Sequence, residues 1–287
     1  MTLPNLFIIG APKAGTTSLH SYLGQHPEIQ MSAIKEPRFF AGPANGFPYP
    51  EDKVDSLAEY ERLFDPASPV RGESSTDYAV HPRREGAPQR IKELVPEARF
   101  VYLVRDPVAR TVSHYRMAAA LFGERRSLNQ ALREDLDHPD SAYVVPSLYA
   151  TQLELYLRHF DRERFLVLDQ AELLGGRRQA LSRVFAFLGV RDEIDERLLD
   201  GQLNESGAWR RYPRGYTSFV GRVVTPAVRW VPAGLRRAVR GRLERSLWRP
   251  IDDSLEAGVR ARLEQRYRPE AARLRELTGE RFASWDV

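Results

Sequence analysis

The chain has 287 residues, 42% of them hydrophobic, and it contains no cysteine. This length is enough for one large domain, and the lack of cysteine excludes disulfides, thiolate catalysis and cysteine-ligated zinc. The net charge is +4, but residues 1–200 carry 25 basic and 29 acidic side chains and residues 201–287 carry 18 and 10, an asymmetry that favours an anionic ligand or surface. The sequence starts without the charged and apolar regions of a signal peptide, and no apolar run reaches the about 18 residues that span a bilayer, so we expect a cytoplasmic protein.

Apolar periodicity predicts strands that alternate with helices. In chain order we expect a strand at residues 6–9, a helix at 16–25, extended chain at 29–31, a helix at 56–64, a strand from 70, a helix at 87–95, a strand at 99–104, a helix from 107, helical segments at 128–137 and 147–159, a strand at 165–168, a helix at 178–188 and three closing helical segments. This alternation predicts an α/β fold in three layers, with a central, mainly parallel sheet flanked by helices. We expect one domain over residues 1–287, with a core at about 1–190 and a basic lid with closing helices at about 204–287.

The loop between the first strand and the first helix reads GAPKAGTTS, from Gly10 to Ser18. Its two glycines allow a tight turn, so the backbone amides can point inward at an anion in front of the positive end of the helix. In a triphosphate loop the lysine follows the second glycine, whereas here Lys13 precedes Gly15 by two residues. An ordinary strand-to-helix turn can show the same glycines, so the loop alone is a weak signal.

The position of the lysine argues against a triphosphate. A triphosphate loop shares Mg²⁺ with an acidic residue that follows another strand. Here the strand at 99–104 ends in Arg105 instead. A donor that carries less charge than a triphosphate, bound without a metal ion, fits these residues better.

A second motif, YLVRDPVARTVSHY, covers residues 102–115. Arg105 at the strand end can offer two parallel N–H groups to a phosphate, and Ser113, two turns into the next helix, can add a hydroxyl. The alternative interpretation is a surface pair of Arg105 and Asp106 that caps the helix.

Together the two motifs resemble those of sulfotransferases that use 3′-phosphoadenosine 5′-phosphosulfate (PAPS). The first is similar to the family's 5′-phosphosulfate loop, and the second is similar to its 3′-phosphate motif. The resemblance implies a P-loop-like fold, PAPS as donor, 3′,5′-adenosine bisphosphate (PAP) as product and no metal. The residues that would contact the donor are Lys13, Ala14, Gly15, Thr16, Thr17, Ser18, Arg105 and Ser113.

Two further stretches resemble the carbohydrate sulfotransferases, the heparan sulfate type in particular: KEPRFF at 35–40 and GESSTDY at 72–78. The closing segment, up to residue 285, resembles that group as well. The resemblance implies that Glu36 is the catalytic base. Three residues would then lie on the acceptor side: Lys35, Arg38 and Ser74.

The chain departs from the heparan type at Ser74, where those enzymes carry lysine, and at Thr76, where they carry proline. These departures put a heparan-like acceptor in doubt. Cytosolic sulfotransferases use a histidine as base, so His81, just after GESSTDY, is the alternative candidate. Two more histidines, His20 and His114, follow the phosphate motifs and could pack beside the site.

The basic C-terminal segment offers further donor contacts. We expect Arg210, Arg211 and Arg214 to approach the 3′-phosphate. The apolar spacing within residues 219–249 predicts a lid helix that packs on the core. A basic amphipathic helix could also contact an anionic membrane or an acidic acceptor. No nucleic-acid-binding module is recognised.

The sequence thus predicts transfer of a sulfuryl group from PAPS to a hydroxyl or an amine of a carbohydrate, a glycolipid or a natural product. Two alternatives stay open at this point. One is a P-loop kinase that acts on a small molecule. The other is a nucleotide-binding protein that attaches to the membrane periphery. The sequence determines neither the acceptor nor the oligomeric state.

Overall fold

The structure is a computed structural model that describes residues 1–42, 54–194, 210–211 and 249–287. Its centre is a five-stranded sheet in the order β2-β3-β1-β4-β5, in which every neighbouring pair is parallel. The strands are β1 (Leu6–Gly10), β2 (Ile29–Met31), β3 (Val70–Glu73), β4 (Arg99–Val104) and β5 (Phe165–Asp169). A separate antiparallel pair joins β6 (Arg210–Arg211) and β7 (Arg249–Pro250).

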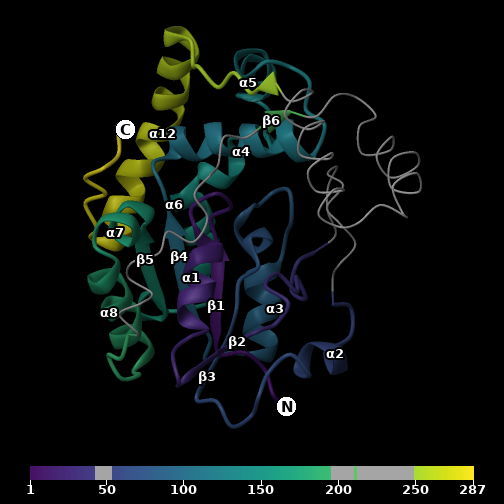
Figure 1. Cartoon of the computed structure of the whole chain (residues 1–287), viewed down its shortest axis with the longest axis vertical. Coiled ribbons are helices and arrows are strands. Elements are labelled where there is room, and N and C mark those ends of the chain that lie inside the picture. The colour runs from purple at the N-terminus through teal and green to yellow at the C-terminus, as the bar shows by residue number, and fades with distance from the viewer. Residues whose placement is uncertain (43–53, 195–209, 212–248) are drawn as a thin grey trace, which may run out of the picture.

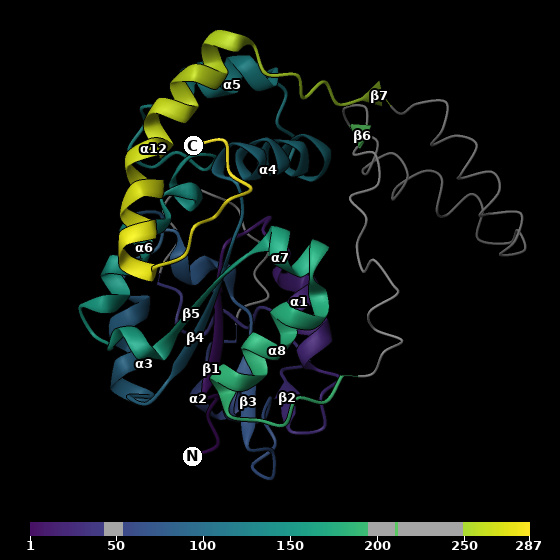
Figure 2. The same cartoon turned by 90° about the vertical axis from the view of Figure 1, so that its left-hand side faces the viewer.

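Helices cover both faces of the sheet. In Figure 2, α1 and α8 lie on one face and α3 and α6 on the other, with α12 outside α6. The predicted three-layer α/β fold with a parallel sheet is therefore confirmed. The helices are α1 (Thr16–Leu23), α2 (Leu57–Glu61), α3 (Ala87–Leu94), α4 (Pro107–Leu121), α5 (Leu128–Asp135), α6 (Tyr149–Leu157), α7 (Gln170–Gly175), α8 (Arg177–Leu188) and α12 (Ala257–Thr278), with the short 3-10 turns η1 (Thr76–Ala79), η2 (Val145–Ser147) and η3 (Arg162–Arg164).

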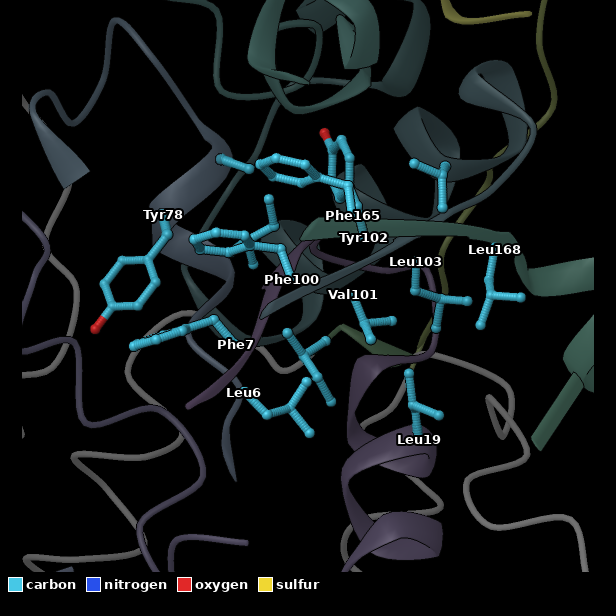
Figure 3. Packing of buried hydrophobic residues seen from close by; sticks show 14 of the residues in the cluster. Leu6, Phe7, Leu19, Tyr78, Phe100, Val101, Tyr102, Leu103, Phe165 and Leu168 are labelled. Atoms are coloured by element: carbon cyan, nitrogen blue, oxygen red, sulfur yellow. The ribbon is translucent and has the colours of Figure 1, made fainter. Parts of the chain in front are cut away.

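The central strands hold the core together. All five residues of β1 are buried, as expected for a strand with partners on both sides and helices on both faces. Phe7 lies opposite Phe100 in the register, and Phe100 lies opposite Phe165, so the three rings stack on one face of the sheet (Figure 3). Each buried ring contributes about 1.5–3 kcal/mol relative to an exposed one.

One difference from the predicted elements is informative. The structure adds α7, which the sequence analysis missed. Asp169 caps it by accepting a hydrogen bond from the amide of Ala171, and Glu172 reaches back to the amide of Asp169. Because Asp169 and Glu172 have the spacing of a capping box, the start of α7 could have been predicted from the sequence. Of the three closing helical segments, α12 lies in the described part of the chain, and the rest of that prediction falls outside it.

The topology brings the predicted motifs to one edge. Because the strands are parallel, the loops that follow β1, β3 and β4 all leave the same edge of the sheet. The segment after β2 joins them, since Ser32 donates from its amide to the carbonyl of Gly72. Among the described residues, no helix has both the length and the apolar character needed to cross a membrane.

Candidate active site

The loop after β1 turns sharply into α1. Gly15 takes a left-handed backbone conformation with φ of 97°, and a Cβ atom there would come 3.2 Å from Nε2 of Gln170. Lys13 is also left-handed, with φ of 72°, a conformation that costs a residue with a side chain about 1 kcal/mol or more. Thr16 and Thr17 open α1, where the first N–H groups of a helix have no intrahelical acceptor. The loop thus has the form of an anion site.

Two arginines, Arg105 directly after β4 and Arg110 in the first turns of α4, hold this loop from the other side. Nη1 of Arg105 lies 3.3 Å from the carbonyl oxygen of Lys13, and Nη1 of Arg110 lies 3.3 Å from that of Pro12. Asp106 accepts a hydrogen bond from the amide of Ala109 at 2.7 Å and so caps α4. The two predicted phosphate motifs therefore meet. The sequence analysis missed Arg110, which is fully buried in the structure.

These cations affect one another. Burial, together with the charges of Arg105, Arg110 and Lys35, lowers the pKa of Lys13 to about 8. Burial is also the main cause of the lowered pKa of Arg105, to which Arg110 adds. Like charges that are close together and partly buried favour the binding of an anion, which would raise the pKa of Lys13 again.

Ser113 lies on α4, where it is buried. The strand β6, formed by Arg210 and Arg211, runs beside α4, so the backbone of the basic segment returns to the helix that carries Ser113 (Figure 2). Arg214 and residues 219–248 lie outside the described residues. Their predicted contacts with the donor or with a membrane stay predictions.

Glu36 lies in the segment that follows β2, and two cations hold it. Nζ of Lys35 is 2.6 Å from Oε1 of Glu36, and Nη2 of Arg38 is 3.0 Å from Oε2. Burial raises the pKa of Glu36, but the two cations outweigh burial and hold its pKa below the ordinary value. The carboxylate is therefore ionised at neutral pH, which a general base must be.

Arg38 bridges two carboxylates. Besides Glu36, it approaches Asp77, whose Oδ2 lies 3.4 Å from Nε of Arg38. The same oxygen of Asp77 lies 2.9 Å from Nε of Arg84. Asp77 is almost fully buried on η1, so this ion-pair chain ties the Glu36 segment to the turn after β3.

Ser74 is fully buried, and its Oγ lies 2.8 Å from Nδ1 of His20 on α1. Its amide also donates to the carbonyl of Lys35 at 3.1 Å. Burial, with the nearby charge of Lys35, lowers the pKa of His20 to about 4, so this ring is neutral. The second histidine, His114, is buried against Arg110, with Nδ1 3.2 Å from Nη1.

His81 lies in different surroundings. Its Nδ1 is 3.9 Å from Oε1 of Glu85, and its backbone pairs with the side-chain amide of Gln152. It lines a cavity of about 260 Å³ that is bordered by α3 and α6. Lys13 and Glu36 are absent from the lining of that cavity. Among the described residues, no group of three or more histidine or acidic side chains is arranged to hold a metal ion.

A parallel sheet with a glycine-bounded anion loop at its carboxyl edge, faced by an arginine from the next strand, defines the class of P-loop-like nucleotide-binding enzymes. The family model described as "Sulfotransferase family" matches residues 4–194 of the chain. This chain belongs to that family. The predicted family and fold are confirmed, and with them the prediction of a transferase enzyme.

Individual relatives agree with this assignment. Human heparan sulfate glucosamine 3-O-sulfotransferase 6 is 27% identical over 286 residues, covering 97% of this chain and 73% of that protein. Bifunctional heparan sulfate N-deacetylase/N-sulfotransferase 1 of Xenopus tropicalis is 27% identical over 211 residues, but the alignment spans only 23% of that longer protein. A solved sulfotransferase structure from Alicyclobacillus acidocaldarius superposes over 99% of both chains, with a TM-score of 0.70 and 25% identity. These relatives favour the sulfotransferase prediction over the kinase alternative.

Proposed function

We propose that the protein transfers a sulfuryl group from PAPS to a hydroxyl or an amine of a carbohydrate, glycolipid or natural-product acceptor, by in-line displacement. One observation carries this proposal. The cations around the β1–α1 loop and the ionised carboxylate of Glu36 lie at the same edge of one parallel sheet. The names of the heparan sulfate relatives support a carbohydrate acceptor.

The donor roles follow from the loop. PAPS would supply the sulfuryl group, with PAP as its leaving group. Lys13 holds the 5′-phosphate beside the bond that breaks, and the backbone and hydroxyls of residues 14–18 surround it. Arg105 and Ser113 hold the 3′-phosphate, with Arg210, Arg211 and Arg214 as additional contacts.

The acceptor roles follow from the segment after β2. Glu36 takes the proton of the acceptor hydroxyl while the new oxygen–sulfur bond forms. Lys35 and Arg38 keep Glu36 ionised and oriented. Ser74 stands where the heparan type carries a lysine, and its buried hydroxyl is hydrogen-bonded to the neutral ring of His20, so this position supplies no cation to the acceptor.

The reaction is tested with sulfur-radiolabelled PAPS and a panel of acceptor extracts, in buffer that contains EDTA. We expect label to move into an acceptor fraction. A parallel incubation with γ-phosphorus-labelled ATP and Mg²⁺ tests the kinase alternative. Transfer of phosphorus label without transfer of sulfur label would overturn the proposal.

The base is tested by substitution. Glu36→Gln keeps the size of the side chain but removes its basicity, so we expect turnover to be abolished while PAP affinity and thermal stability stay at wild-type levels. His81→Ala is the matched control, and it should remain active. If Glu36→Gln keeps wild-type kcat while His81→Ala is inactive, the base is His81.

Two predictions concern the environment of the protein. Residues 219–249 may be tested by flotation with vesicles of anionic and of neutral lipid, because a basic amphipathic helix binds only the former. A cytoplasmic location likewise stays a prediction. We infer no oligomeric state.

A further inference from the structure

Glu73, the last residue of β3, is a fully buried carboxylate that the mechanism above does not use. Three hydroxyl groups donate to it. Ser75 donates to Oε2 at 2.5 Å, Tyr78 donates to Oε1 at 2.8 Å, and Tyr60 donates to the same Oε1. Burying a carboxylate among hydroxyls costs stability, so its presence calls for another explanation than stability.

The same hydroxyls also hold the segment that follows Glu36. Oγ of Ser75 accepts from the amide of Arg38 at 3.0 Å, and the phenol oxygen of Tyr78 accepts from the amide of Phe40 at 3.1 Å. A hydroxyl has one proton to donate. Because each hydroxyl donates its hydrogen bond to Glu73, its oxygen lone pairs remain available to accept from the two amides.

The segment needs such support. Arg38 has a left-handed backbone with φ of 56°, which an arginine adopts only when its surroundings enforce it. The ring of Phe39 stacks on that of Tyr60 with centroids 4.4 Å apart, which adds a third attachment. In this conformation the guanidinium of Arg38 reaches Oε2 of Glu36.

We propose that Glu73 is a positioning residue for the reaction: by accepting hydrogen bonds from the hydroxyls of Ser75 and Tyr78, it holds the backbone of residues 38–40 in the conformation that brings Arg38 to Glu36. This inference rests on the proposed role of Glu36 as base. Glu73 itself touches no substrate.

The charge state of Glu73 supports this role. Burial raises the pKa of Glu73 to about 7, against the lowering effect of its three hydroxyl partners, and the charge of Glu36 adds to the rise. The other titratable groups that face Glu73 are Tyr60 from α2, Tyr78 from η1 and Tyr156 from α6. Burial holds the pKa of all three well above the ordinary value, so they keep their protons.

A pH dependence follows. Only an ionised Glu73 accepts from all three hydroxyls, since a protonated carboxyl has a proton of its own to donate. We therefore expect kcat to fall as pH decreases through about 7. Glu36 stays ionised over that range because its pKa is lowered.

The test is Glu73→Gln, measured by turnover of radiolabelled PAPS with one acceptor extract at a fixed saturating concentration. Glutamine has one acceptor oxygen where the carboxylate has two, so either Ser75 or the two tyrosines lose their acceptor, and we expect kcat to fall about tenfold or more. KM for PAPS and Kd for PAP should change less than about twofold, and the fall of kcat near pH 7 should disappear. Glu270→Gln is the matched control, because Glu270 is also buried but bonds to Thr151 instead.

Ser75→Ala is the second variant, because it removes only the hydroxyl that connects Glu73 to the amide of Arg38. It tests the inference even if Glu73→Gln does not fold. It should lower kcat with unchanged PAP affinity. Wild-type kcat with an unchanged pH profile in the folded Glu73→Gln, or wild-type kcat in Ser75→Ala, overturns the inference. A Glu36→Gln variant that remains active contradicts the proposed base instead, so the two failures are distinguishable.

Discussion

The proposed donor side, around the β1–α1 loop, and the proposed acceptor side, around Glu36, are both rich in cations, but they differ in how those cations are balanced. On the donor side, burial and the positive charges of Arg105 and Arg110 lower the pKa of Lys13, and the more weakly acting charge of Lys35 adds to them from the acceptor side. On the acceptor side, Lys35 and Arg38 contact Glu36, and Arg38 shares Asp77 with Arg84. The cations of the donor side leave a net positive charge around Lys13, whereas those of the acceptor side are paired with Glu36 and Asp77.

This difference assigns a task to each side. Repulsion among buried like charges raises the free energy of the unbound protein. An anion relieves this repulsion when it binds, so the relief adds to the affinity for the donor. A balanced group gains little from an anion, but it keeps a carboxylate ionised and oriented for proton transfer.

Lys13→Ala should lower kcat by about 10²–10³-fold and weaken PAP binding less. Negative charge grows on the 5′-phosphate as its bond to sulfur breaks, so a cation there stabilises mainly the transition state. Initial rates with labelled PAPS and titration with PAP separate the two effects. Lys92→Ala, at an exposed lysine on α3, is the control. A variant in which only KM for PAPS rises would make Lys13 a simple binding residue.

Arg105→Ala should lose its preference for PAP over AMP. The guanidinium is expected to bind the 3′-phosphate, and loss of such a pair typically costs about 2–5 kcal/mol when the partner charge is buried. The ratio of the two Kd values, from calorimetric titration, measures the effect. Arg116→Ala is the control, because Arg116 lies on the helix that follows Arg105 and pairs with Asp253. Wild-type discrimination in Arg105→Ala would refute this assignment.

PAP affinity should decrease above about pH 8. Lys13 in the free protein loses its proton as pH rises through about 8, whereas a bound phosphate favours its protonated form. Affinity is therefore full below that pH and falls by at most about tenfold per pH unit above it, with proton uptake on binding. Calorimetry in two buffers with different ionisation enthalpies measures this uptake. Constant affinity between pH 7 and pH 10 would contradict the charged state assigned to Lys13 in the complex.

Lys35→Met should change PAP affinity least, by less than about threefold, because Lys35 belongs to the balanced acceptor side. Its loss should raise the pKa of Glu36, since the charge of Lys35 is the main influence that lowers it. Titration with PAP gives the first quantity. A loss of affinity as large as that in Arg105→Ala would place Lys35 on the donor side and break the comparison.

The sequence predicted well which residues gather around the β1–α1 loop, because the signals there are local. In each motif a strand, a turn and the first turns of a helix follow one another directly, so spacing alone places Lys13, Gly15 and Arg105. Arg110 was missed although it lies three residues before Ser113, on the same face of α4. Its contact with Pro12 joins two segments that are 98 residues apart, and no local pattern specifies such a contact.

The acceptor side was predicted less completely for the same reason. KEPRFF identified Glu36 and its neighbouring cations, which are adjacent in sequence. The hydrogen bond between His20 and Ser74 spans 54 residues. Glu73 accepts from Tyr60 on α2 and from Tyr78 on the turn after β3, which are 13 and 5 residues away but in no regular spacing with it. Only the packing of the sheet brings these groups together.

We propose that the donor side holds a nucleotide with phosphates on both its 3′ and 5′ positions. Calorimetric titration with PAP in the presence of EDTA tests it most directly, with AMP and Mg²⁺–ATP as the compared ligands. We predict saturable binding of PAP without a metal ion and weaker binding of AMP. Binding of Mg²⁺–ATP with no detectable binding of PAP would contradict the account.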